Sequence, residues 1–314
     1  MMADRYSVVI PTYNRRRTLL TVLDALARQD RPELVEEVVV VDDGSTDGTS
    51  EAVRGLQMPL TIRLLEGRRG GPAAARNAGV EAARGQRVLF LCDDIAAGPG
   101  LIAAHHARRS EAGGPCAVVG RIEWPPGKSI SHFQAFVMEH YHFGFGSLAG
   151  REELPFHAFI TANLSIEREL LLRLGGFDEG FEYGWEDTDL GLRAEEAGVR
   201  ILYAPEAVAY HHHEIDPGSY CRRQAAVGRS AAHFAQKHPD RPEVVGLNRL
   251  PRPWSPRWLL KGALFNRLMR PGWTTVAHAL SAIGARRPAE LVYSQVLAAC
   301  YYGGMAEALR EREA

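Results

Sequence analysis

The chain has 314 residues, of which 46% are hydrophobic and 24% charged, and this composition excludes a disordered, fibrous or polytopic membrane protein. Basic and acidic residues number 37 and 38, so a formal charge of −1 gives the chain as a whole no attraction for nucleic acid. At ~150 residues per domain, the length fits about two ordinary domains or one large one.

The cysteines and the apolar runs bear on the cellular compartment. The four cysteines follow no CxxC spacing, which predicts neither a disulfide framework nor a zinc site. The apolar stretch before Pro11 is too short for a signal peptide, and no apolar run approaches the ~20 residues that span a bilayer. We therefore expect a cytoplasmic protein, or one attached to the inner face of the plasma membrane.

The first 95 residues alternate between two hydrophobic periods. Short β-branched runs typical of strands buried on both faces are Ser7–Ile10, Val38–Val41, Leu60–Leu65 and Val88–Leu91. Helical stretches between them are Arg16–Gln29, Thr49–Leu56 and Pro72–Ala83. The alternation predicts an α/β fold with a parallel sheet covered by helices on both faces. Ligands bind beyond the carboxyl ends of such strands, where this chain reads PTYN, DDGSTDGT and CDD.

The later elements follow a looser pattern. Those expected are a helix at Leu101–Glu111, a strand at Ala117–Ile122, an irregular acceptor-side segment at Glu123–Pro155, a strand at Phe159–Leu164, helices at Arg168–Leu174 and Asp187–Glu196, and strand pieces at Ile201–Ala204 and Val208–His211. Beyond Asp216 the pattern is helical. We expect a catalytic domain at 1–215, divided into a nucleotide-binding part (1–96) and an acceptor-binding part (97–215), and a helical extension at 216–314.

Two acidic pairs follow strands. Asp42-Asp43-Gly44 is either a turn, with Ser45 or Thr46 capping the next helix, or a carboxylate site for a nucleobase or sugar. The neighbouring carboxylates of Asp93 and Asp94 raise each other's pKa unless a cation resolves the repulsion, and hard oxygen ligands suit Mg²⁺ or Mn²⁺. The alternative for this second pair is an Asx turn.

Three further segments carry polar groups. GGPAAARNAG (70–79) opens a helix with small residues that allow close packing, and its Arg76 is a solvated charge or a partner of a diphosphate or carboxylate. In Trp185–Asp189 a helix N-terminus favours acids and lowers their pKa, whereas burial raises it. In the run from His211 to His213, either one histidine ligates a metal or the strand end is partly exposed.

In this order the segments resemble the family 2 glycosyltransferases with a GT-A fold. The matching segments are VVIPTYNR (8–15), VVVVDDGSTDGT (38–49), ARNAGV (75–80), VLFLCDD (88–94), ITANLSIER (160–168), GGFDEGFEYGWEDTDLGLRAEEAG (175–198) and PEAVAYHH (205–212). The resemblance implies a nucleoside-diphosphate-sugar donor, a divalent metal and inversion at the anomeric carbon. The same resemblance implies that the acceptor is a saccharide, a lipid-linked molecule or a small molecule, as in polysaccharide, glycolipid or secondary-metabolite glycosylation.

The resemblance also assigns site residues. On the donor side it implies that Pro11, Tyr13 and Asp43 contact the nucleobase and that Asp93 contacts the ribose. It also implies that Asp94 holds Mn²⁺ or Mg²⁺ and that His211 approaches this metal or the diphosphate. Arg76 belongs to the donor-binding residues in the same assignment. On the acceptor side it implies Asp187 as the base, with Trp185 and Glu186 shaping the site. Cys92 departs from the pattern, because many members have a third Asp there.

Two other functions stay open at this point. One is a metal-dependent nucleotidyltransferase or phosphotransferase on a similar nucleotide-binding sheet. The other is a scaffold that binds a nucleotide-sugar without turnover. The Glu186–Asp187 pair favours the glycosyltransferase, because a nucleotidyltransferase has less need of an acceptor base so far along the chain.

A basic section closes the sequence. Residues 244–289 contain no Asp or Glu and eight basic residues, which are Arg249, Arg252, Arg257, Lys261, Arg267, Arg270, Arg286 and Arg287. Aromatic residues such as Trp258 and Trp273 lie among them, without a single apolar stripe. Either this section packs on the catalytic domain or on the second subunit of a homodimer, or it docks on anionic lipid. Nothing in it resembles a nucleic-acid recognition module.

Overall fold

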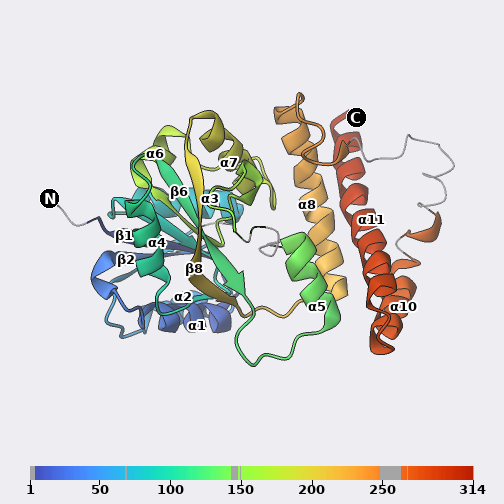
Figure 1. Ribbon diagram of the computed structural model, residues 1–314, viewed down its shortest axis with the longest axis horizontal. Helices are drawn as coiled ribbons and strands as arrows, with labels where there is room; N and C mark the ends of the chain where they lie inside the picture. The colour runs from blue at the N-terminus through green and yellow to red at the C-terminus, as the bar shows by residue number, and fades with distance from the viewer. Residues whose placement is uncertain are drawn as a thin grey trace. The chain divides into compact units, whose positions relative to one another are not determined.

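The computed structural model describes residues 4–67, 69–142, 148, 150–247, 263–266 and 268–313. The chain forms two compact units (Figure 1). The first comprises residues 1–128, 143–179 and 186–213, and the second residues 129–142, 180–185 and 214–314. Within the described ranges, none of the helices has the length and hydropathy that crossing a bilayer requires.

The first unit is built on one sheet, which has eight strands in the described part of the chain, in the order β3-β2-β1-β4-β7-β6-β8-β5. Their bounds are β1 (Tyr6–Thr12), β2 (Val35–Asp42), β3 (Ile62–Glu66), β4 (Arg87–Leu91), β5 (Ile95–Ala97), β6 (Cys116–Glu123), β7 (Asn163–Glu167) and β8 (Arg200–His211). Strands β3, β2, β1 and β4 run parallel, β7 is antiparallel to both neighbours, and β6 and β8 are parallel. The carboxyl ends of β1, β2 and β4 therefore lie at one edge.

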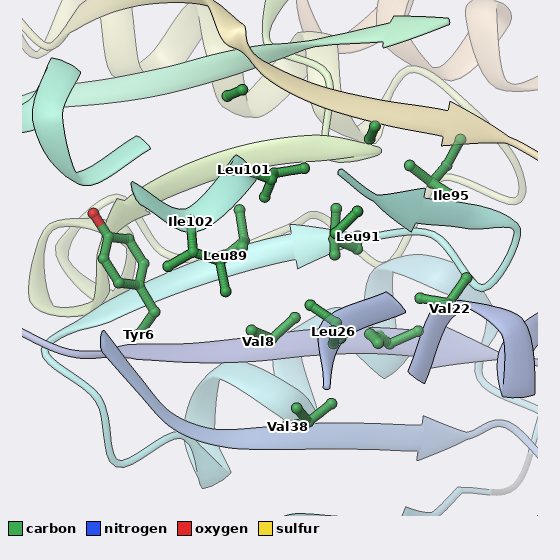
Figure 2. Packing of buried hydrophobic residues seen from close by; sticks show 14 of the residues in the cluster. Tyr6, Val8, Val22, Leu26, Val38, Leu89, Leu91, Ile95, Leu101 and Ile102 are labelled. Carbon is green, nitrogen blue, oxygen red and sulfur yellow. The ribbon is translucent and has the colours of Figure 1, made fainter. Parts of the chain in front are cut away.

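Alternating side chains on the strands feed two hydrophobic cores. On one face Val8, Val38 and Leu89 pack with helices α1 (Arg16–Leu26), α2 (Thr49–Arg54) and α4 (Leu101–Ser110), as Figure 2 shows for α1 and α4. On the other face Val9 and Phe90 pack with helices α3 (Gly71–Ala82), α6 (Arg168–Arg173) and α7 (Glu186–Glu196). The sheet is thus held rigidly between two helical layers.

The second unit is helical. Its helices are α5 (His132–Val137, continued by a π-helical turn at Met138–His142), α8 (Pro217–Lys237), α10 (Arg270–Ala282) and α11 (Arg286–Glu313). Helix α8 begins where the sequence places a cap and a proline, because the Asp216 carboxylate accepts hydrogen bonds from the backbone N–H groups of Gly218 and Ser219. Helices α8, α10 and α11 lie side by side (Figure 1).

The predicted α/β class, mostly parallel sheet, flanking helices and helical C-terminal extension are confirmed. Three local predictions are wrong. The strand expected at Phe159–Leu164 begins at Asn163, the two strand pieces near residue 205 form the continuous β8 with an irregular register, and the segment expected to be irregular contains α5. Most of the basic section, including Arg249, Arg252, Arg257, Lys261, Arg267, Trp254 and Trp258, lies outside the described residues.

Candidate functional site

The two acidic residues at the end of β2, Asp42 and Asp43, have different hydrogen-bond partners. The buried Asp42 accepts hydrogen bonds from the Ser45 N–H and the Ser50 hydroxyl, which close the turn and fasten α2. Asp43 instead accepts from the backbone N–H groups of Gly70 (2.7 Å) and Gly71 (2.9 Å) at the start of α3. The turn is therefore confirmed at Asp42, but neither Ser45 nor Thr46 caps α2, whose N-cap is Gly48. The Asp43 carboxylate lies at the sheet edge against a helix N-terminus, which favours negative charge.

An aromatic and a guanidinium side chain lie beside the end of β1. Tyr13 is 38% exposed, and the Arg69 guanidinium lies 4.8 Å from the centroid of its ring. The Asn14 side chain accepts a hydrogen bond from the Thr46 N–H, which fastens the loop after β1 to the loop after β2. Pro11 in β1 is half-buried. The two loops thus present a flat aromatic face and a cation, groups on which a nucleobase can stack.

Asp93 is held to the same strand end. Its carboxylate accepts a hydrogen bond from the Thr12 hydroxyl (2.8 Å) and one from the Tyr13 backbone N–H. Burial, followed by the neighbouring charge of Asp94, raises the pKa of Asp93 to about 7. The repulsion expected between the two adjacent carboxylates is therefore present and is not relieved by the groups around them.

Asp94 faces the histidines at the end of β8. Its Oδ2 lies 3.8 Å from His211 Nε2 and 3.9 Å from Arg15 Nη1, and its backbone oxygen accepts from the His212 N–H. Arg15 Nη1 also donates to His213 Nδ1 at 2.7 Å. Because a guanidinium only donates, Nδ1 of His213 acts as the acceptor. Of the three histidines, His211 is the one whose ring nitrogen approaches Asp94.

The donor set around Asp94 suits a hard divalent cation in part. Among the described residues, no group of three or more His, Cys, Asp or Glu side chains is arranged to hold a metal. Two ligands each about 2.1 Å from one ion are at most about 4.2 Å apart, and the 3.8 Å between Asp94 and His211 meets this condition. Mg²⁺ is commonly held by one or two carboxylates together with substrate phosphates, so this pair fits a cation that a diphosphate completes.

The two acids at the start of α7, Glu186 and Asp187, also lie in different surroundings. Asp187 is half-exposed and is held by Thr161, whose N–H donates to Oδ2 at 3.0 Å and whose hydroxyl contacts Oδ1 at 2.8 Å and Oδ2 at 2.9 Å. The carboxylate is therefore fixed in orientation while part of its surface faces solvent. This is the geometry that a general base needs.

Glu186 is buried and forms an ion pair with Arg76. The two side chains are 6% and 8% exposed, and Arg76 Nη1 lies 3.0 Å from Glu186 Oε1. Burial, with the charge of Asp187, raises the pKa of Glu186, and Arg76 opposes the rise. Of the readings open for Arg76, a solvated charge is excluded and pairing with a carboxylate is observed.

Trp185 carries backbone strain. It adopts φ +74°, the left-handed region that a bulky residue rarely occupies, and its ring centroid lies 5.2 Å from that of Phe234, which belongs with it to the second unit. Its indole N–H is buried, and the described residues provide no hydrogen-bond partner for it. Such strain is kept where surrounding structure enforces it, and it is frequent at active sites.

Cys92 lies where the two acidic clusters meet. The charges of Asp94, Arg76, Asp93 and Asp187 all act on its partly buried thiol, so these four groups lie in its neighbourhood at the sheet edge. Burial, followed by Asp94, raises the pKa of Cys92 to about 12, and the thiol is therefore neutral. The predicted donor-side and base residues are thus brought together by β4, α3 and α7.

Sequence reasoning missed three residues of this site. Thr161 holds Asp187, Arg15 bridges Asp94 and His213, and Arg69 covers Tyr13. Arg15 and Thr161 lie within motifs that the family resemblance already covered, at VVIPTYNR and ITANLSIER. No local spacing rule connects either residue to its partner, because each contact is tertiary.

The chain is similar to known proteins in sequence and in fold. Residues 7–171 match the family described as glycosyl transferase family 2, and residues 103–283 match glycosyl transferase family group 2. Validoxylamine A glucosyltransferase of Streptomyces hygroscopicus subsp. limoneus is 31% identical over 265 residues, which cover 74% of this chain and 57% of that protein. Pre-mycofactocin glycosyltransferase of Mycobacterium tuberculosis is 31% identical over 245 residues, covering 75% and 48%.

Solved structures share the fold at lower identity. Mannosyltransferase PcManGT from Pyrobaculum calidifontis, solved with GDP-Man and Mn²⁺, has a TM-score of 0.65 and 22% identity over 98% of this chain and 88% of that one. TarS of S. aureus, solved with UDP, has a TM-score of 0.54 and 20% identity over 98% and 92%. Since the family match spans more than half of the chain and runs through the strand ends described above, the chain belongs to glycosyl transferase family 2.

Proposed function

We propose that this chain transfers a sugar from a nucleoside-diphosphate sugar to an acceptor hydroxyl, with inversion at the anomeric carbon and with Mn²⁺ or Mg²⁺ bound. The observation that carries the proposal is the convergence of Asp93, Asp94 and Asp187 on Cys92. One acidic cluster serves the leaving group and the other the incoming alcohol. The names of the relatives, a glucosyltransferase and a mannosyltransferase among them, support the same class of reaction.

Asp187 takes the proton from the acceptor hydroxyl as its oxygen attacks the anomeric carbon. Thr161 holds both carboxylate oxygens of Asp187. The neighbouring acid, Glu186, is paired with Arg76 and therefore does not compete for the proton. A positioned base of this kind contributes typically ~10²–10⁴-fold to the rate. Trp185 and Glu186 shape the acceptor side.

Tyr13, Arg69 and Pro11 receive the base of the donor, and Asp43 accepts a hydrogen bond from it. Asp93 binds the ribose. Asp94 and His211 would hold the divalent ion, which when bound would supply positive charge against the charge that develops on the departing diphosphate. Arg15 lies 3.9 Å from Asp94 and adds a fixed positive charge at the same place.

Turnover of purified protein tests the proposal directly. With a donor and an acceptor, nucleoside diphosphate should be released, and Asp187→Asn should reduce its release at least 100-fold. Glu196→Gln, which removes an exposed acid from the other end of α7, is the matched control and should leave the rate unchanged. Release of pyrophosphate would instead identify a nucleotidyltransferase, and full turnover by Asp187→Asn would refute the assigned base.

The donor and the metal can be read from thermal stability, because a ligand that binds only the folded state raises Tm. UDP-, GDP- and dTDP-sugars should be compared with Mn²⁺, with Mg²⁺ and with a chelator. We expect one nucleotide class to raise Tm, with a smaller shift in the chelator and in Asp94→Asn. An equal shift with and without metal would contradict the metal site.

The exposed face of the C-terminal helices supports docking on an anionic membrane surface. In the turn after α10 and the first turns of α11, Ile283 (79% exposed) and Leu291 (67%) present apolar side chains, and Arg286 and Arg287 are exposed in the same stretch of sequence. Cations next to apolar side chains suit anionic headgroups over a hydrocarbon layer. Sedimentation with anionic but not neutral vesicles is expected, and Arg286→Glu/Arg287→Glu should abolish it. Concentration-dependent dimerisation without vesicle binding would assign this face to a homodimer instead.

A further inference from the structure

Two cysteines that are distant in sequence meet in the second unit. Cys221 lies in α8 and Cys300 in α11, and the Cys221 thiol donates a hydrogen bond to the sulfur of Cys300. Cys221 is partly exposed, whereas Cys300 is buried. The other two cysteines, Cys92 and Cys116, lie in the first unit and have no part in this contact.

The two helices touch through their backbones next to this pair. A Cβ placed on Gly304 would lie 2.0 Å from the Ala225 oxygen, and one placed on Gly228 would lie 1.9 Å from the Tyr301 oxygen. Ala225 and Gly304 each follow one of the cysteines by four residues, which is about one helical turn. The cysteines therefore precede the tightest approach of α8 and α11 by one turn. Disulfides need Cα atoms about 4.4–6.8 Å apart, a spacing that only such closely packed helices reach.

A cation accompanies the pair. Arg270, the first residue of α10, donates from Nη2 to the Ala299 oxygen at 3.1 Å, and its guanidinium also hydrogen-bonds the Cys300 sulfur. The hydrogen bond from Cys221, together with Arg270, lowers the pKa of Cys300 despite its burial. A thiolate is the nucleophilic form of cysteine, and a neighbouring guanidinium stabilises it.

We propose that Cys221 and Cys300 are a redox-active dithiol that a peroxide converts to a disulfide joining α8 to α11. The thiolate of the pair attacks one peroxide oxygen, the O–O bond breaks, and the departing hydroxide takes a proton to form water. The second sulfur then attacks the resulting sulfenic acid, the S–S bond forms, and a second water leaves. The two sulfurs lose two electrons in total, and hydrogen peroxide gains them.

Thiol counting and peptide mapping on the full chain test the proposal. Reduced, desalted protein is treated with hydrogen peroxide, denatured and alkylated, with and without a thiol reductant. We expect the loss of two of the four thiols, full recovery with reductant, and one cross-linked peptide pair containing Cys221 and Cys300. Loss of no thiols, irreversible loss, or a cross-link through Cys92 or Cys116 would overturn the proposal.

Thermal unfolding gives a second readout. The disulfide should raise Tm by about 5 °C, because it restrains the unfolded chain. The rise should disappear in Cys221→Ser and persist in Cys116→Ser, the matched control from β6. A rise of the same size in oxidised Cys221→Ser would refute the assignment.

Discussion

At the scale of the residue, the acid pair at the start of α7 shows how neighbours in sequence receive opposite roles. Glu186 points into the protein and is neutralised by Arg76, while Asp187 stays half-exposed and is bonded to Thr161. The sequence favours Asp187 only through the family resemblance, because both residues are acids in the first turn of a helix. The difference comes from α3 and from the turn before β7, which supply the two partners.

Thr161 should act as a positioning residue for Asp187. Thr161→Val keeps the shape of the side chain but removes the hydroxyl, and hydrogen bonds to charged groups are worth about 1.5–3 kcal/mol. We expect kcat to fall about 10- to 100-fold with little change in the KM for the donor, while Thr161→Ser retains most activity. Steady-state kinetics measure both, and a loss shared equally by the Ser variant would argue against the hydrogen bond.

The Arg76–Glu186 pair should behave as a buried ion pair. Arg76→Met leaves an uncompensated acid, and breaking such a pair typically costs 3–5 kcal/mol of unfolding free energy, whereas removing both charges costs much less. Urea unfolding of Arg76→Met, Glu186→Leu and the double variant measures the coupling. Additive losses in the double variant would contradict a direct pair.

At the scale of the element, hydrophobic period predicted most strands and helices of the first unit because their apolar pattern is local. The predicted start of β7 is too early because Phe159, Ile160 and Ala162 are apolar but lie in the turn before the strand, whereas the strand begins at the polar Asn163. Asn163 is buried with its side chain bonded to His105 in α4 and to the Ala207 oxygen in β8. Pairing with β4 and β6, which no local pattern records, fixes that register.

Helix α5 did carry a local signal. Ser131 and Gln134 form a capping box, in which each side chain bonds the backbone N–H of the other residue. The S-x-x-Q spacing is readable in the sequence, but the aromatic and histidine-rich context around it favoured an irregular segment. A short helix with a sound cap can therefore be found by its first turn even when its period is too brief to measure.

The contact of α8 with α11 depends on one glycine of an adjacent pair. Alanine at position 304 would press its Cβ against the Ala225 oxygen, whereas alanine at position 303 would meet only the flexible end of Arg270 at 3.7 Å. We expect Gly304→Ala to destabilise the protein by about 1–3 kcal/mol. Gly303→Ala should be neutral or stabilising by up to about 1 kcal/mol, because alanine favours helix. Equal Tm values for the two variants would contradict this packing.

At the scale of the whole molecule, a buried histidine couples stability to pH. His105 is fully buried between Ser165 and Asn163, and burial lowers its pKa to about 4 from 6.5. Between these values the unfolded chain binds a proton that the folded chain does not, so the unfolding free energy should fall by up to about 3 kcal/mol as pH drops from 6.5 to 4. Urea unfolding at pH 7 and pH 5 and an NMR titration of His105 measure this effect. A histidine that titrates near 6.5 would contradict it.

The sequence predicts the site residues that lie at strand ends, but it does not predict which side chains contact one another across different elements. Asp43, Asp93 and Asp94 follow strands and His211 ends one, and sheet topology brings such positions to one edge. Thr161, Arg15 and the Cys221–Cys300 pair have no periodic signal, since each partner lies on a separate element. Contacts of that kind depend on how the helices pack on the sheet. No short stretch of the sequence carries a pattern that predicts this packing.

Helix α3 begins at the nucleotide end and continues to the acceptor end. Its first backbone groups are bonded to Asp43, and Arg76 one turn later is bonded to Glu186. Gly79 has no side chain and so lets the helix lie close to the sheet, because a Cβ at this position would lie 2.4 Å from the Val9 side chain. A twelve-residue helix moves as a stiff rod, so tilting it disturbs both ends at once. Damage anywhere along this rod should therefore impair donor affinity and turnover together.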